Sequence, residues 1–170
     1  MKPLVRPMAL PDLDAVLDIQ RACYGEGFLE GADVINRRIT SRVGLSCVAE
    51  REGRVCAYLA AYRTQPGKLT PLHGDFEATS EPSSWPDTLY LHDLAVDPEA
   101  RGSGAADALV QAFLSALARL PLPRASLIAI QGSAPWWARH GFARVPVDGA
   151  LGARLAGYGE DAAYMVRLTG

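Results

Sequence analysis

The sequence has few cysteines and no long apolar run, and both scarcities exclude classes of protein. Its 170 residues include only Cys23, Cys47 and Cys56, none of them in a C-x-x-C pair. A disulfide framework is therefore not expected, and we interpret the three as reduced core thiols. No run reaches about 18 apolar residues, and the N-terminus lacks the apolar block and cleavage site of a secretory signal. We expect a cytoplasmic protein that does not cross a membrane.

The chain also lacks a large excess of charge of either sign, with 17 basic and 19 acidic residues. Lysine occurs only twice, as Lys2 and Lys68, and the formal net charge at pH 7 is −2. Such a chain has no overall electrostatic attraction to nucleic acid or to an anionic membrane. We expect neither as a partner.

Length and composition predict one globular domain. A domain has roughly 150 residues, and 49% of this chain is hydrophobic and 21% charged. These fractions are ordinary for a folded protein and exclude a mainly disordered one. We expect residues 1–170 to form a single domain, as a monomer or a homodimer.

The hydrophobic pattern switches along the chain between the period of a strand and that of a helix. Strands are predicted at residues 3–6, 45–50, 55–62, 88–96, 126–130 and 162–168, with another starting at 141. Helices are predicted to begin at residue 11 and to span about 32–41 and 105–120. A short helix is predicted to begin after Ser133, which is expected to cap it, and to end at residue 139. Residues 64–86 show no period, which is typical of a functional or mobile loop. A hairpin followed by strand–helix alternation predicts an α/β or α+β fold with a mixed sheet.

A glycine-rich turn between a predicted strand and a predicted helix has the features of an anion site. Backbone N–H groups at a helix start have no partner within the helix, and the helix dipole is positive there. Gly102 and Gly104 let the backbone approach a phosphate closely, and Arg101 adds a fixed charge. A P-loop is excluded because no Gly-Lys-Ser/Thr follows, and a dinucleotide site is disfavoured because Asp107 occupies its last small position. The alternative is a plain tight turn with an arginine in solvent.

The turn resembles the acetyl-CoA site of the GNAT N-acetyltransferases. The family pattern is R-x-x-G-x-G/A after a strand that ends in Ala-Val-x-Pro, and the segment Arg-Gly-Ser-Gly-Ala-Ala at 101–106 fits every fixed position. The segment Trp-Trp-Ala-Arg-His-Gly-Phe at 136–142 resembles the short helix and Gly-Phe of the same family. The resemblance covers nearly the whole chain and is most specific at 88–110 and 126–142.

The resemblance implies a fold and a coenzyme. The fold is a mixed, mostly antiparallel sheet of six to seven strands flanked by helices, which splays between strands 88–96 and 126–130. Acetyl-CoA, the co-substrate, occupies this opening in a core of about residues 88–142, with its pantetheine arm along the strand backbone and its pyrophosphate on 101–106; no metal is implied. The implied cofactor-binding residues are Leu94, Ala95, Val96, Arg101, Gly102, Ser103, Gly104, Ala105, Ala106, Ser133 and Trp137.

The implied chemistry is direct transfer of the acetyl group to a primary amine. His92 is the candidate base because imidazole titrates near neutral pH, and the arylalkylamine acetyltransferases carry a histidine at the corresponding place. Being two residues before Leu94, it is expected on the same strand face as Leu94, with Asp93 on the opposite face. A backbone N–H near Leu94 would stabilise the oxyanion. The alternative is a histidine buried in the core for structural reasons.

The general acid and the acceptor are less defined. Many relatives have a tyrosine four residues before the Gly-Phe, but this chain has Trp137, whose indole does not supply a proton readily. Tyr164, Tyr158 or solvent could substitute, and we take Tyr164 as the candidate. Tyr90, Asp93 and Trp85 are the candidate substrate residues.

The sequence leaves the acceptor and the acyl group open. The acceptor is a small-molecule amine or a protein amine. The competing hypotheses are a coenzyme-A-sensing module without turnover and a transferase of a longer acyl group.

Overall fold

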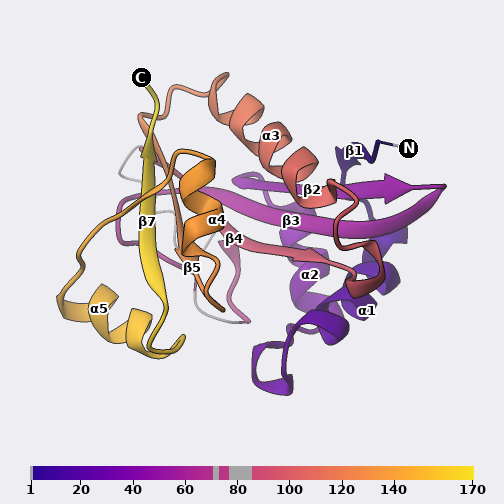
Figure 1. Cartoon of the computed structure of the whole chain (residues 1–170), viewed down its shortest axis with the longest axis horizontal. Coiled ribbons are helices and arrows are strands. Elements are labelled where there is room, and N and C mark those ends of the chain that lie inside the picture. Colours follow the sequence, from indigo (N-terminus) through magenta and orange to yellow (C-terminus); the bar gives the residue numbers. More distant parts are fainter. Residues whose placement is uncertain (1, 71–72, 77–85) are drawn as a thin grey trace.

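The computed structural model describes residues 2–70, 73–76 and 86–170, and these form one mixed sheet with helices on both faces (Figure 1). The strand order is β1-β2-β3-β4-β5-β7-β6, and every neighbouring pair is antiparallel except β4 and β5. The strands are β1 Leu4–Pro7, β2 Gly44–Arg51, β3 Arg54–Thr64, β4 Thr88–Val96, β5 Arg124–Ala129, β6 Ala143–Arg144 and β7 Ala163–Leu168. The predicted mixed, mostly antiparallel sheet is confirmed.

The helices divide between the two faces of the sheet. The helices are α1 Leu13–Cys23, α2 Ala32–Thr40, α3 Ala105–Leu117, α4 Ala134–Arg139 and α5 Gly149–Ala156, with short 3-10 turns η1 Leu10–Asp12, η2 Glu26–Phe28 and η4 Pro98–Ala100. The apolar stripe of α3, including Leu109 and Phe113, packs on one face together with Trp137 of α4. Val16 and Ile19 of α1 pack on the other face (Figure 1). Burial of these stripes on both sides holds the sheet in place.

The sheet opens between its two parallel strands. Residues 88–91 of β4 pair with residues 124–127 of β5, and among the described residues the ladder stops there. Beyond that point β4 continues to Val96 and β5 to Ala129, and the two strands run apart (Figure 1). The predicted splay between these strands is therefore confirmed, and it leaves one edge of each strand facing the opening.

A β-bulge in β4 changes which side chains face the two sides of the sheet. The register with β3 shifts from Ala60 opposite Asp93 to Ala61 opposite Leu91, so His92 is the extra residue. Leu91 belongs to the core on the α3 face, and Leu94 packs against the same core. Both residues between them turn to the other face. The expectation that His92 shares a face with Leu94 is wrong because the bulge interrupts the two-residue alternation. Asp93 lies on the face opposite Leu94, as expected, but His92 lies on that face with it.

Two local expectations about helices also differ from the structure. Ser133 stands at the start of α4 as predicted, but its side chain makes no capping hydrogen bond. Helix α5 was not predicted, because Gly149 and Gly152 lower its intrinsic helix propensity. Tertiary contacts hold it: Leu151 packs against an aromatic cluster, and Arg154 Nη1 donates to the Leu69 carbonyl at 2.5 Å. Across the described ranges, no helix combines the length and apolarity needed to cross a bilayer.

Candidate active site

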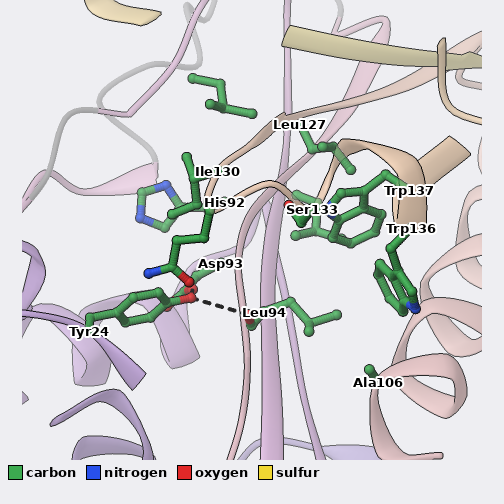
Figure 2. Close-up of a pocket in the computed structure, with 13 residues that line it drawn as sticks. Tyr24, His92, Asp93, Leu94, Ala106, Leu127, Ile130, Ser133, Trp136 and Trp137 are labelled. Atoms are coloured by element: carbon green, nitrogen blue, oxygen red, sulfur yellow. Dashed lines mark hydrogen bonds between the residues drawn. The ribbon is translucent and has the colours of Figure 1, made fainter. Parts of the chain in front are cut away.

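A cavity of about 290 Å³ fills the opening between β4 and β5 (Figure 2). One end is polar and is formed by Tyr24, His92 and Asp93. The other end is formed by α4 and the first turn of α3, where Trp137 and Ala106 line the wall. The remaining lining residues are Leu91, Leu94, Leu127, Ile128, Ile130, Gln131, Ser133 and Trp136. The cavity thus runs from His92 to Ala106, which follows the glycine-rich turn in the first turn of α3.

The turn before α3 has the backbone that an anion cradle requires. Gly102 and Gly104 have φ of +78° and +83°, and a Cβ built on either would meet nothing within 4 Å. The helix begins its hydrogen bonds with Ala108 N–H to the Gly104 carbonyl at 3.0 Å, so the helix does not use the N–H groups before that point. Within the turn, the N–H groups of Arg101 and Ser103 donate to the Pro98 and Ala100 carbonyls, and that of Ala105 donates to Ser103 Oγ. Among the described residues, the N–H groups of Gly102, Gly104 and Ala106 have no hydrogen-bond partner, so these three are the groups that could bind a phosphate.

His92 is hydrogen-bonded to the carboxylate of Glu30, which was not among the site residues predicted from the sequence. Its Nε2 lies 3.0 Å from Glu30 Oε1, and Arg38 Nη1 lies 2.5 Å from the same oxygen. Burial opposes ionisation of Glu30, but the hydrogen bonds from His92 and Arg38 outweigh it and lower its pKa to about 2. A carboxylate only accepts, so His92 donates from Nε2; in the neutral imidazole, the form that can act as a base, the lone pair is then on Nδ1. Glu30 therefore fixes the tautomer of His92.

Several contacts hold Glu30 in the segment between α1 and α2. The Gln20 side-chain amide donates to the Glu30 carbonyl at 2.8 Å and accepts from the Glu30 N–H at 3.0 Å. The His73 N–H donates to Glu30 Oε2 at 2.9 Å, and Arg38 donates to the Gly74 carbonyl at 2.8 Å. In the sequence, the flanking Gly31 marks this segment. Because the segment shows neither a helix nor a strand period, the direction of the Glu30 side chain could not be predicted from it.

Asp93 lies between two tyrosines at the polar end of the cavity. Tyr24 Oη is 2.6 Å from Asp93 Oδ1 and 3.1 Å from the Leu94 carbonyl (Figure 2). Tyr58 Oη is hydrogen-bonded to Asp93 Oδ2. Burial raises the pKa of Asp93, although the two tyrosine hydrogen bonds act to lower it. Burial also raises the pKa of Tyr24 well above its ordinary value, and the nearby Asp93 charge raises it further.

A smaller cavity of about 50 Å³ adjoins the same polar residues. It shares Tyr24, His92 and Asp93 with the larger cavity and is closed by an aromatic pair. Phe28 of η2 and Tyr158, after α5, stack with ring centroids 6.3 Å apart. His92 therefore stands where two cavities meet.

The structure brings together only some of the predicted residues. His92, Asp93, Leu94, Ala106, Ser133 and Trp137 all line the large cavity. Tyr90, at 3% exposure, is buried against Tyr62, and Tyr164 stands opposite Ile128 in the β5–β7 ladder; neither lines the two cavities. Trp85 lies outside the described residues. Among the residues that the structure describes, no group of three or more His, Cys, Asp or Glu could hold a metal ion.

A split mixed sheet, with a glycine cradle at one end of the split and a histidine at the other, defines a class of enzymes that bind an extended phosphate-bearing co-substrate. Comparison with known families places the chain within this class. The model of the acetyltransferase (GNAT) family matches residues 13–142, and the chain belongs to this family. It is an acyltransferase of the N-acetyltransferase type.

Solved structures share the fold at low sequence identity. The PaiA N-acetyltransferase of Thermoplasma acidophilum, in complex with coenzyme A, superposes with a TM-score of 0.71 at 12% identity, covering 99% of this chain and 100% of that one. The loading GNATL domain of CurA from Lyngbya majuscula gives 0.75 at 14% identity, covering 98% and 96%. A GNAT-like decarboxylase, GphF, in complex with isobutyryl-CoA gives 0.69 at 19%, covering 97% and 98%. A search of curated proteins by sequence finds no match.

Proposed function

We propose that this protein transfers an acetyl group from acetyl-CoA directly to a primary amine. The observation that carries the proposal is the extent of the large cavity, which runs between the diverging strands from His92 to Ala106, the residue two positions after Gly104. Only an elongated co-substrate, with phosphate at one end and its reactive group at the other, uses both ends of such a cavity. Acetyl-CoA has this shape and fits the family to which the chain belongs.

The coenzyme would contact the protein mainly through backbone groups. Its pyrophosphate would lie on residues 101–106 and accept hydrogen bonds from the N–H groups of Gly102, Gly104 and Ala106, which have no partner among the described residues, with the Arg101 side chain beside it. Its pantetheine arm would lie along residues 94–96 of β4, whose edge faces the opening because the ladder with β5 has ended. Ser133 and Trp137 would border the arm on the α4 side.

His92 would act as the general base. Its Nδ1 accepts no hydrogen bond from the described residues and carries the lone pair, so it can take a proton from the attacking amine. The Glu30 carboxylate then stabilises the imidazolium that forms, because the two groups already share a hydrogen bond. A backbone N–H near Leu94 on the open edge would stabilise the oxyanion. The reaction requires no covalent enzyme intermediate.

The smaller cavity would admit the acceptor amine. It shares His92 with the large cavity, and the stacked pair Phe28 and Tyr158 lines it as well. Phe28 is 39% exposed, so an apolar surface is available to an incoming molecule. We infer a primary amine attached to a flat apolar group on a small molecule, with protein N-termini and lysines as the alternative acceptors.

A thiol-release assay tests the proposed reaction and its base. The wild-type protein should release coenzyme A from acetyl-CoA when given arylalkylamines, and more slowly with peptides or with succinyl-CoA as donor. His92→Gln should lower kcat by about 10²-fold or more at neutral pH, the usual contribution of a general base. Binding of coenzyme A should persist in this variant, because His92 is at the end remote from the cradle.

His73→Gln is the matched control. The His73 side chain is exposed, and its contact with Glu30 is made by the backbone N–H, which the substitution keeps. It should have wild-type turnover. Firm coenzyme binding without amine-dependent thiol release would instead support a sensing module, and equal rates for His92→Gln and the wild type would remove His92 from the mechanism.

A further inference from the structure

Breaking the thioester leaves a thiolate that must gain a proton, and Trp137 stands where many relatives have a tyrosine. Among the described residues that line the large cavity, only Tyr24 and Ser133 carry a hydroxyl group. A serine hydroxyl is a far weaker acid than a phenol, and Ser133 lies beside the tryptophans of α4, whereas Tyr24 lies with His92 at the polar end (Figure 2). Tyrosine can act as a general acid. The position of Tyr24 is thus the one that a proton donor to the thiolate would occupy.

The hydrogen bonds around Tyr24 show which group can return a proton to its hydroxyl oxygen after it has donated one. Its single hydroxyl proton faces two acceptors, Asp93 Oδ1 at 2.6 Å and the Leu94 carbonyl at 3.1 Å, while Tyr58 donates to the other carboxyl oxygen. If Asp93 is protonated on Oδ1, it donates to Tyr24 Oη, and Tyr24 donates to the Leu94 carbonyl. Every group then has a partner, which is the arrangement that buried polar groups adopt. Burial raises the pKa of Asp93, which favours this protonated form.

We propose that Tyr24, backed by Asp93, is the general acid that protonates the departing coenzyme A thiolate. The proposal rests on the acyl transfer proposed above, and it assigns the acid role to the end of α1 in place of Tyr164 on β7. The side chain of Tyr24 lines both cavities, so it can reach a sulfur atom placed next to His92. Tyr58, which contacts the same carboxyl group, lines neither of them.

The proton transfers balance over one turnover. The neutral amine bonds to the carbonyl carbon and gives one proton to His92 Nδ1. The C–S bond then breaks, its electron pair goes to sulfur, and the Tyr24 hydroxyl passes its proton to that sulfur. Asp93 gives its proton to Tyr24 Oη, so no phenolate remains in a site where burial makes one unfavourable. His92 is left with one extra proton and Asp93 with one fewer, and exchange with solvent restores both.

The experiment compares two Tyr→Phe variants that each remove one hydroxyl from Asp93. Tyr24→Phe should lower kcat for acetyl transfer by about 10²-fold, the usual contribution of a general acid, with the KM for acetyl-CoA and the binding of coenzyme A unchanged. Tyr58→Phe should retain turnover near that of the wild type. Asp93→Asn, which keeps the hydrogen-bonding shape but carries no acid proton, should lower kcat in the same direction as Tyr24→Phe.

The outcomes separate this proposal from the one on which it rests. If the wild type turns over and Tyr24→Phe matches it, Tyr24 is not the acid and the acyl transfer still stands. Equal losses in Tyr24→Phe and Tyr58→Phe would also overturn the proposal, because they would indicate a role in holding Asp93 rather than in proton delivery. If the wild type releases no thiol with any amine, both proposals fall. Coenzyme binding measured on each variant identifies a loss caused by misfolding.

Discussion

At the scale of single residues, Glu30 connects three parts of the molecule. It lies between α1 and α2, it is paired with Arg38 of α2, and it is hydrogen-bonded to His92 of β4. The side chains of Glu30 and Arg38 are each 3% exposed, so neither charge is stabilised by bulk water. Removing one member of such a pair leaves the other buried and uncompensated, which is strongly destabilising. Glu30, which orients the proposed base His92, is thus also a residue on which the fold depends.

The free energy of unfolding should depend on pH through Glu30. Its pKa falls from 4.5 to about 2 on folding, which corresponds to about 3 kcal/mol of stability. Because the folded pKa is the lower one, this contribution is complete above pH 4.5 and is lost as the pH falls toward 2. Urea unfolding of the wild type and of Glu30→Gln should show the largest difference at pH 7 and a smaller one at pH 3.

The control for this prediction is an exposed glutamate. Glu52, at the β2–β3 turn, has a side chain that is 70% exposed, so Glu52→Gln should unfold like the wild type at both pH values. A stability difference for Glu30→Gln that is the same at pH 7 and pH 3 would contradict the assigned pKa.

The sequence allowed some of these residues to be predicted and not others. His92 stood out because an imidazole in a strand beside a phosphate motif suggests proton transfer. Its neighbours could not be predicted, because the bulge at His92 shifts the side-chain alternation by one residue. Glu30 and Tyr24 come from the segment around η2, where the absence of periodicity leaves side-chain directions undetermined.

At the scale of elements, the junction of β4 and α3 is the part that the sequence predicted best. Its backbone is dictated by local chemistry, since glycine is the residue that most readily adopts positive φ and a helix start leaves its N–H groups available. Helix α5 shows the opposite case. Its contacts with Leu69 and with the aromatic cluster are tertiary, and a sequence with two glycines in eight residues did not indicate them.

Substitution of Gly104 should separate coenzyme binding from folding. Gly104→Asp places a carboxylate where the pyrophosphate would lie, so the affinity for coenzyme A should fall by at least an order of magnitude, roughly the effect of one unfavourable charge contact. Isothermal titration with coenzyme A measures this directly.

Gly53→Asp provides the matched control. Gly53, in the β2–β3 turn, has φ of +75°, against +83° for Gly104, and a Cβ at either position meets nothing within 4 Å. The two variants therefore carry similar backbone strain, and only Gly104→Asp should lose affinity. Equal coenzyme binding by both would contradict the phosphate cradle.

At the scale of the whole molecule, the sheet consists of two parts that share only a short ladder. Strands β1 to β4 form one antiparallel part, strands β5, β7 and β6 form the other, and residues 88–91 with 124–127 join them. A co-substrate held between the parts contacts both, so its binding should stabilise the molecule as a unit. Linkage requires any ligand that binds only the folded state to raise the free energy of unfolding.

Coenzyme A should therefore raise thermal stability in a selective way. At a concentration 100 times its Kd, it should add about 2.7 kcal/mol to the free energy of unfolding. NAD and ATP contain phosphates but lack the pantetheine arm, so they should have a smaller effect at equal concentration. Scanning calorimetry with each compound tests this, and an equal shift with all three would indicate nonspecific anion binding.

The early end of the β4–β5 ladder has a further consequence for the protein without its coenzyme. Most sheets have unpaired backbone N–H and C=O groups only on their edge strands, where charged side chains and short strand length prevent pairing with other chains. Here the part of β4 beyond residue 91 has no neighbouring strand on the side of β5, although it lies in the middle of the sheet. Side chains cover part of this backbone, because the Leu94 carbonyl accepts from Tyr24 Oη and the Val96 carbonyl accepts from Cys23 Sγ. If coenzyme A occupies this opening, as proposed, it would cover interior strand backbone with which an extended peptide could otherwise pair.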